Sequence, residues 1–294
     1  MALTLVLMLP AATSAGAEVV AQPELRKFSG YVQKIPGTVV RFELLPVPAG
    51  RVEARDSKNA EPRIVDVKPF WIGKTEVTWD EFDIFAFALD APTKEARHQF
   101  LSEGKTRPSY VYSDPRLGFG HHRYPAICVS RYAATMYCNW LTEKTGRRYR
   151  LPTPEEWQWA CAAGRKTPPT RQEIDAAAWH RENCVIDYDW PDGKTHPVGT
   201  KQPNAFGLQD MLGNVAEWVL REGEDPAHKP VAAGGSWQSL PHLLHGGYRQ
   251  TQTERWQITD PQHPKSRWWL TDGGFVGFRV VCDDVPFGAT NNRN

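Results

Sequence analysis

The sequence predicts an α+β fold that is rich in loops, and three observations support this. Glycine and proline contribute 23 and 24 of the 294 residues, so we expect frequent chain reversals. Twelve tryptophans indicate a core built from large aromatic rings. Three helix-start signals lie among short apolar segments that have the length of strands. We find neither an internal repeat nor a linker after residue 30, and we therefore expect one domain.

The composition is that of a globular protein. Hydrophobic residues make up 40% and charged residues 23%, which is typical of a folded rather than a disordered chain. The net charge is +1 and no long block of one sign occurs, so nucleic acid is not an expected partner. After the first residues, no stretch is long and apolar enough for a transmembrane helix.

The N-terminus predicts export to the periplasm or the medium. Residues 3–10 are apolar, and Ala15-Gly16-Ala17 is a cleavage site of the A-x-A type. No Lys or Arg precedes the apolar run, which departs from the usual signal peptide, and an apolar N-terminal strand is the alternative. The expected division of the chain is a signal peptide (1–17), a tether (18–38), a domain (39–285) and a frayed tail (286–294).

The five cysteines are Cys128, Cys138, Cys161, Cys184 and Cys282. No CxxC spacing occurs, so a zinc site is not expected. An oxidising compartment allows one or two disulfides, but the spacing does not identify the pairs. Cys138 and Cys161 lie among apolar residues, which favours buried thiols.

The first part of the domain predicts two strands and a helix. Residues 39–47 and 64–72 have strand-like apolar patterns, and the charged residues 51–63 between them indicate a loop. Thr78 and Glu81 then form a capping box, because the threonine can cap a helix whose third residue is the glutamate.

Two further helices and a last strand follow an excursion loop at residues 91–124. Ser130 is the expected N-cap of a helix that ends near Gly146, and Thr153 is that of another, with proline at its first position. Beyond Arg165 the apolar segments are short. Residues 275–281 indicate the final strand.

Four sequence blocks resemble the formylglycine-generating enzyme, or sulfatase-modifying factor, family. They read LPTPEEW (151–157), GNVAEW (213–218), GGSW (234–237) and GFR (277–279). The resemblance covers residues 39–282, and other details are similar to a bacterial exported subgroup without an assigned reaction. It implies a loop-rich, C-type-lectin-like variant of an α+β fold.

The resemblance also implies structural calcium. The first site would use the carbonyl oxygens of Leu212, Gly213 and Val215 and the carboxylate of Glu217. Oxygen ligands that converge in an irregular, glycine-containing loop suit this ion. Asn183 and Asp192 are the candidates for a second site, although their spacing departs from the family pattern. The alternative for Glu217 is a buried carboxylate without an ion.

The catalytic cysteines of the family are missing. In the active enzyme, two cysteines after the Gly-Gly-Ser block bind copper(I), a metal that thiolates suit. Residues 234–249 contain no cysteine. The first cysteine position falls at or near Ser239 and the second among residues 243–245. Copper and the family's oxidation reaction are therefore not expected.

The remaining groove candidates are polar residues after the same block: Ser239, His242, His245 and Arg249. The two histidines are either metal ligands or loop residues. Arg249 and Arg279 have counterparts in the family, for which a salt bridge or a clamp on carbonyl groups is expected.

Two functions are compatible with these features. The first is an exported binding or maturation module for a peptide, a glycan or a protein partner. The alternative is a metal-dependent oxidase of the same superfamily with an unknown substrate. A polar pocket that unites the four groove candidates favours the enzyme. A shallow aromatic surface favours binding, with the candidates Trp237, Tyr248, Trp256, Trp268 and Trp269.

Overall fold

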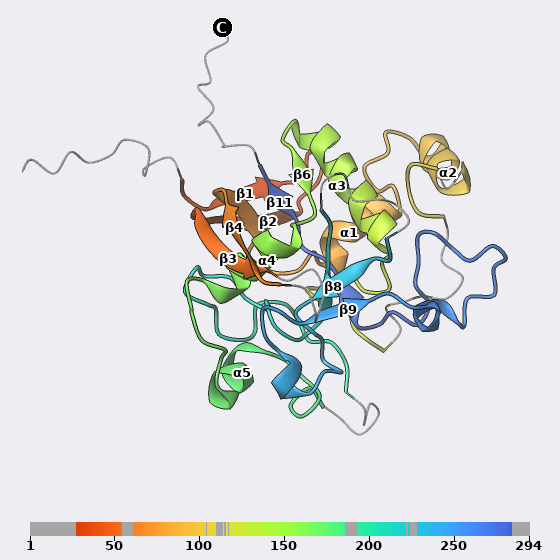
Figure 1. Ribbon diagram of the computed structural model, residues 1–294. Coiled ribbons are helices and arrows are strands. Elements are labelled where there is room, and N and C mark those ends of the chain that lie inside the picture. Colours follow the sequence, from red (N-terminus) through yellow and green to blue (C-terminus); the bar gives the residue numbers. More distant parts are fainter. Residues whose placement is uncertain are drawn as a thin grey trace, which may run out of the picture.

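The computed structural model describes residues 28–54, 61–103, 105–109, 114, 116, 118–185, 193–221, 223 and 228–283. The expected signal peptide, the first part of the tether and the expected tail lie outside these residues. In the described part, short helices and strands are joined by long loops (Figure 1). The helices are α1 (Trp79–Ala86), α2 (Lys94–Glu103), α3 (Arg131–Thr145), α4 (Pro154–Ala162) and α5 (Arg171–Ala177), with 3-10 turns η1 (Pro241–Leu243) and η2 (Glu254–Gln257).

One sheet joins the two ends of the domain. Its strand order is β1-β2-β5-β11-β6, and its neighbouring strands are antiparallel. Its strands are β1 (Tyr31–Lys34), β2 (Arg41–Val47), β5 (Phe70–Gly73), β6 (Tyr149–Arg150) and β11 (Val281–Cys282). Because β11 lies between β5 and β6, the last described strand is held by earlier parts of the chain (Figure 1).

A second sheet contains or adjoins three of the four family blocks, namely GNVAEW, GGSW and GFR, whereas LPTPEEW leads into α4. Its order is β10-β7-β8-β9, with β10 parallel to β7 and the other pairs antiparallel. Its strands are β7 (Ala216–Val219), β8 (Val231–Ala233), β9 (Arg249–Thr251) and β10 (Val276–Gly277). A separate hairpin pairs β3 (Gly50–Ala54) with β4 (Arg63–Val67) and packs on α4.

The three expected helix starts are confirmed. Glu81 accepts hydrogen bonds from the backbone N–H of Thr78 at 3.0 Å and from its hydroxyl at 2.7 Å. The Ser130 hydroxyl accepts from the N–H of Ala133 at 3.1 Å, and Gly146 ends α3 with a φ of 69°. Thr153 and Glu156 form the capping box of α4.

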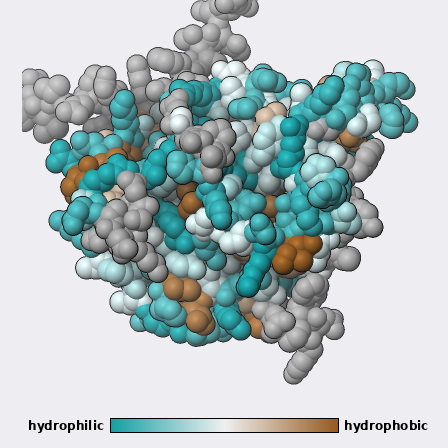
Figure 2. Space-filling model, turned by 45° about the vertical axis from the view of Figure 1, so that its right-hand side comes forward, coloured by the Kyte–Doolittle hydropathy of each residue, from teal (hydrophilic) through white to brown (hydrophobic). Residues whose placement is uncertain are grey.

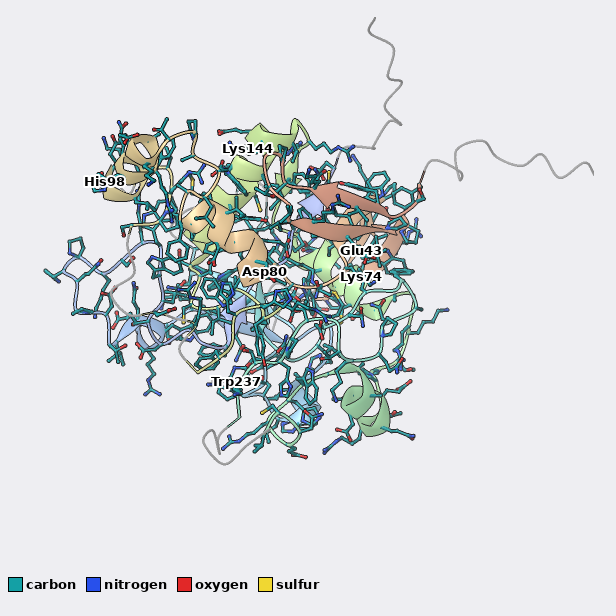
Figure 3. All side chains as sticks on the ribbon, turned by 180° about the vertical axis from the view of Figure 1, so that it is seen from behind. Glu43, Lys74, Asp80, His98, Lys144 and Trp237 are labelled. Carbon is teal, nitrogen blue, oxygen red and sulfur yellow. The ribbon has the colours of Figure 1, made fainter. Side chains whose placement is uncertain are left out.

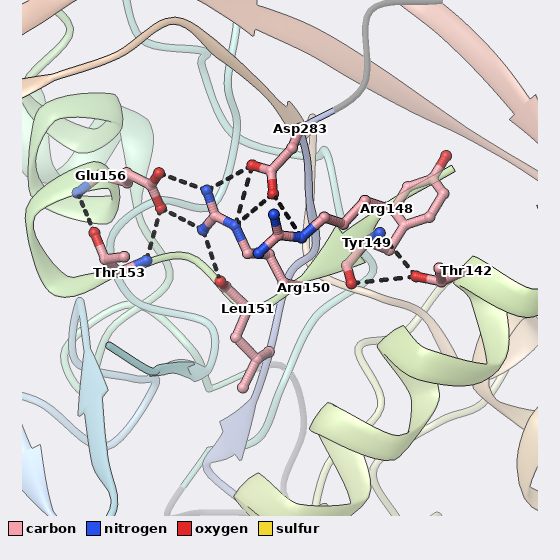
Figure 4. Close-up of polar contacts among 8 residues, drawn as sticks. All are labelled: Thr142, Arg148, Tyr149, Arg150, Leu151, Thr153, Glu156 and Asp283. Carbon is pink, nitrogen blue, oxygen red and sulfur yellow. Dashed lines mark hydrogen bonds and ion pairs between the residues drawn. The ribbon is translucent and has the colours of Figure 1, made fainter. Parts of the chain in front are cut away.

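Arg150 connects the start of α4 to the end of the domain (Figure 4). Its guanidinium donates to both carboxylate oxygens of Glu156, at 2.6 and 2.7 Å, and to Asp283 at 2.7 Å. Because Glu156 also caps α4, this one arginine links β6, α4 and the residue after β11.

Several elements differ from the expected ones. The predicted loop at 51–63 contains most of β3, because Val52 and Ala54 alternate inward from a mainly polar segment. The expected strand at 64–72 divides into β4 and β5, which belong to different sheets, and Lys68-Pro69 separates them. Likewise, the expected last strand divides into β10 and β11.

Three further elements were not expected. β1 lies in the segment assigned to the tether, so the sheet begins before residue 39. α2 lies within the expected excursion loop. α5 follows a capping box of Thr170 and Glu173, a signal that the sequence does contain.

The expected aromatic core is confirmed. Trp79, Phe82, Tyr137 and Phe278 are buried, and Phe82 contacts the other three rings at centroid distances of 5.8 to 6.0 Å. All five cysteines are free thiols, of which Cys161 alone is partly exposed. Among the described helices, none has the length and apolar character needed to cross a membrane.

Candidate functional site

The loop that follows β8 begins with two glycines in the left-handed region. Gly234 and Gly235 have φ values of 91° and 72°. A Cβ at Gly234 would lie 2.9 Å from the carbonyl oxygen of Met211, and one at Gly235 would lie 3.0 Å from the Ser239 hydroxyl. Glycine is therefore required here both by conformation and by space.

Ser239 closes this loop rather than opening into a groove. The residue is buried, and its hydroxyl accepts a hydrogen bond from the backbone N–H of Ser236 at 3.0 Å. Its own N–H donates to the Ser236 carbonyl at 2.9 Å. The side chain at the first cysteine position thus satisfies a buried donor of the loop.

The two histidines of the loop are exposed. His242 lies in η1. The Nδ1 atom of His245 accepts from the N–H of Gly247 at 3.2 Å, so the neutral ring carries its proton on Nε2. Desolvation of the ring by neighbouring atoms and the nearby charge of Arg249 lower the pKa of His245, which keeps the ring neutral near pH 7.

Arg249 is a clamp on carbonyl groups, as expected. Its guanidinium donates to the carbonyl oxygens of Gly246 at 2.7 Å, Tyr248 at 2.8 Å and Pro154 at 3.1 Å, and it lies 5.6 Å from the ring centroid of Trp157. Burial lowers its pKa to about 10. No carboxylate of the described residues forms an ion pair with it. The four groove candidates therefore do not form one polar pocket.

Four of the five candidates for a shallow aromatic surface are buried, namely Trp237, Trp256, Trp268 and Trp269, and only Tyr248 is partly exposed. The described residues therefore do not gather these candidates into such a surface. The indole N–H of Trp237 donates to the Gly274 carbonyl at 3.1 Å, and the residue lies among the loops, away from Glu43 on β2 and Lys74 just after β5 (Figure 3). On the face shown in Figure 2, apolar residues form small, separate patches on a largely hydrophilic surface.

Glu217 is the centre of a buried ion pair. Its two carboxylate oxygens accept from Nε and Nη2 of Arg279, each at 2.6 Å, and one of them also accepts from the indole N–H of Trp157 at 2.7 Å. Arg279 donates in addition to the carbonyls of Gly73 and Gln209, both at 3.0 Å. The expected salt bridge of Arg279 is confirmed, but its partner was not foreseen.

These contacts do not fit calcium ligands. Three N–H donors occupy the carboxylate of Glu217, and the cation beside it is a guanidinium. At the proposed second site, Asn183 uses its side chain to close a turn, accepting from the N–H of His180 at 2.8 Å and donating to the Ala178 carbonyl at 3.0 Å. Asp192 lies outside the described residues.

Residues 212–215, whose carbonyl groups were expected to bind the first calcium ion, pack closely against the loop that contains Trp179. A Cβ at Gly213 would lie 2.1 Å from the carbonyl oxygen of Trp179, and the N–H of Asn214 donates to that same oxygen at 2.8 Å. Leu212 faces a pocket, and Val215 is buried in the core. The segment therefore joins the second sheet to the loop after α5.

A pocket of about 710 Å³ lies beside the loop of the groove candidates. It is formed by the end of α4, the segment that leads to α5, α5 itself, a turn at residues 202–205 and the loop at residues 245–247. His245 is the groove candidate that lines it. Cys161 lines it as well, and sequence reasoning placed this residue in the core.

The loop-rich α+β fold is that of solved structures with low sequence identity to this chain, and the family follows from the sequence. The model of the sulfatase-modifying factor enzyme 1-like domain matches residues 35–283. The chain belongs to this family, and the expected fold class is confirmed.

Proteins that are similar to this chain in sequence or fold carry different names. The chain is 33% identical to the chaperone protein LppX of Paenibacillus barcinonensis, over 69% of this chain and 81% of LppX. It is 31% identical to the formylglycine-generating enzyme of Mus musculus, over 85% and 78% of the two chains. The solved structure of Treponema denticola variable protein 1 superposes with a TM-score of 0.60 at 22% identity, over 87% of this chain and 99% of that one.

Proposed function

We propose that this protein is an exported binding or maturation module that holds a peptide segment of a protein partner and does not oxidise it. The loop at residues 236–249 carries this proposal. It has no cysteine, and the hydroxyl of Ser239 is used to hold the loop together. A buried, hydrogen-bonded serine supplies neither a thiolate for copper(I) nor an exposed nucleophile.

The cysteines elsewhere do not replace the missing pair. Burial raises the pKa of Cys128 and of Cys161 to about 12, and it raises that of Cys138 further. These groups are thiols rather than thiolates near pH 7. Among the described residues, no group of three or more His, Cys, Asp or Glu is placed to bind a metal ion. The contacts therefore favour the binding module over the metal-dependent oxidase.

Export and a protein partner complete the proposal. The segment at residues 1–17 has the pattern of a signal peptide. The relative LppX is named a chaperone, which is consistent with a protein that handles other polypeptides. The pocket beside the loop has a volume typical of sites for small ligands, so we assign it to a short segment of the partner rather than to a folded domain.

Protection of Cys161 from alkylation tests this proposal. Cys161 lines the pocket, whereas the other four cysteines are buried outside it. We expect a neutral maleimide to modify Cys161 slowly, and a pool of short peptides to slow that modification while oligosaccharides do not. The site is identified by mass spectrometry, and Cys161→Ser is the control for reagent specificity. Protection by oligosaccharides alone, or by neither pool, would overturn the peptide-binding function.

A further inference from the structure

We propose that the pocket beside α4 and α5 binds a carboxylate carried on an apolar body, namely a peptide that ends in a small apolar residue or carries an acidic side chain next to one. This inference rests on the proposed function and adds the chemistry of the ligand. The inference depends on the polar groups that line the pocket. Some of these groups have hydrogen-bond or ion-pair partners within the protein, and others are available to a ligand.

The pocket's acidic group and one of its amides are already used within the protein. Glu173 accepts from the Thr170 backbone N–H at 2.7 Å and from Arg165 at 2.8 Å. Asn204 donates to the Ala160 carbonyl at 2.8 Å and accepts from the N–H groups of Phe206 and Leu208. Neither side chain has to change partners when a ligand enters.

Two donors among the remaining groups carry the argument, although the side chains of Gln158, Thr167 and Gln202, which can both donate and accept, also line the pocket. Lys166 is exposed at the rim and forms no ion pair with any described residue. Glu173, the carboxylate of the pocket lining, is paired with Arg165 instead. The Nε2–H of His245 has no acceptor in the described part of the chain, because Nδ1 takes the internal hydrogen bond. An ammonium and an imidazole N–H at one pocket suit a carboxylate and would leave a cationic ligand uncompensated.

Arg249 adds positive charge below the pocket wall. It donates to the carbonyl of Gly246, which lines the pocket, and its known partners are carbonyls rather than carboxylates. A guanidinium that burial has desolvated and whose direct partners are carbonyl groups attracts an anion more strongly than an exposed one. Because Arg249 is not a lining residue of the pocket, this attraction is electrostatic and not a direct contact.

Much of the remaining lining is apolar. Ala162, Pro168, Pro169, Ala176 and Leu212 contribute to it. Prolines and alanines present methyl and methylene groups without unsatisfied donors, so a small apolar side chain is accommodated at little desolvation cost. The combination of apolar walls with donors at the rim therefore selects a carboxylate next to an apolar group.

Calorimetric titration of the full-length protein with three matched peptides tests the inference. The first peptide ends Leu-Pro-Ala with a free carboxylate, the second is its C-terminal amide, and the third is an amide with an internal glutamate beside the alanine. We expect the free acid, the internal acid, or both to bind at least three times more tightly than the neutral amide at low salt, with the difference reduced in high salt.

Two variants locate the effect at the pocket. Lys166→Glu should weaken the acidic peptides about three- to tenfold and leave the amide unchanged, because the substituted residue is exposed and holds no internal partner. Lys94→Glu, which reverses an exposed charge on α2 away from the pocket, is the matched control and should change neither affinity.

The outcomes separate this inference from the function on which it rests. Preference for the free acid alone identifies a chain end, and equal binding of both acids identifies the carboxylate itself; either supports the inference. If the amide binds as tightly as the acids, the carboxylate preference is wrong while peptide binding stands. If no peptide binds and none protects Cys161, both fail.

Discussion

Arg279 and Glu217 form a bidentate ion pair in which both side chains are almost completely buried, with two N–O distances of 2.6 Å. Glu217 lies on β7, and Arg279 lies between β10 and β11. The pair therefore joins the second sheet to the strand that closes the first. It also occupies the carboxylate that the family resemblance assigned to calcium.

Glu217→Gln should destabilise the protein by about 3 kcal/mol, because it leaves a buried guanidinium without its main counter-ion. Removal of one partner of a buried ion pair typically costs about 3 to 5 kcal/mol of stability. We expect a cost at the low end of this range, since Glu76 and Asp210 also interact with the charge of Arg279. Urea denaturation measures the effect. The control is Glu43→Gln, which breaks an exposed pair with Lys74 and should cost less than about 1 kcal/mol. Equal effects of the two changes would contradict the role of the buried pair.

Removal of calcium should leave the melting temperature of the protein unchanged, because we expect no calcium ion at Glu217. Three donors already occupy the carboxylate, and the guanidinium of Arg279 supplies the positive charge that a calcium ion would otherwise bring. The measurement is a thermal scan in excess EDTA and in excess calcium, made on the wild type and on Glu217→Gln. A calcium-dependent rise in the wild type that the variant lacks would show that the ion, and not Arg279, holds this residue.

Gly213→Ala should destabilise the protein by more than about 3 kcal/mol. The new Cβ would meet the Trp179 carbonyl at 2.1 Å, and the residue has a φ of 72°. Gly37→Ala provides the matched control, because Gly37 has a φ of 81° and no atom within 4 Å of the added Cβ. This control carries only the conformational cost, about 1 kcal/mol. Similar losses for both, measured by urea denaturation, would mean that the close approach of the two loops is not rigid.

Glu81 should make stability fall as the pH rises from about 4.3 to about 7. Burial raises its pKa to about 7 in the folded protein, whereas the unfolded value is about 4.3. Between these values the folded state holds the proton that the unfolded state has released, so alkali favours unfolding, by at most about 4 kcal/mol, and the effect levels off above pH 7.

Glu81→Gln isolates this contribution. The amide oxygen can still accept from Thr78 but does not ionise, so the variant should match the wild type near pH 4 and exceed its stability at pH 8. Asp210, whose pKa is raised to about 6 mainly by burial, adds to the slope of both proteins and cancels in the comparison. Urea midpoints that run parallel for the two proteins from pH 4 to 8 would contradict the assignment.

Local signals predicted the helices well because a cap acts over three residues. Thr78, Ser130 and Thr153 each start a helix at the expected position. Strand boundaries were less predictable, because membership in a sheet depends on distant partners. The segment at 275–281 reads as one strand, but Val276 pairs with Ala216 and Val281 with Ile72, which belong to different sheets.

The candidate site was predictable only in its residue types. The sequence shows that residues 234–249 lack cysteine, and it marks Arg279 as a residue that needs a buried partner. It does not show that Glu217 is that partner, 62 residues away. Nor does it bring Cys161 and His245 to one pocket, since this depends on how the loop at 245–247 packs against the end of α4.

The central claim is that this family member binds a peptide without oxidising it. The most direct measurement incubates the purified protein with copper(I), oxygen and peptides that contain cysteine, and follows each peptide by mass spectrometry. We predict that no peptide cysteine is converted to formylglycine beyond the level seen without the protein, whereas the formylglycine-generating enzyme, as the positive control, converts it. Copper-dependent conversion of a peptide cysteine to an aldehyde would contradict the claim and show that a different set of residues has replaced the missing pair.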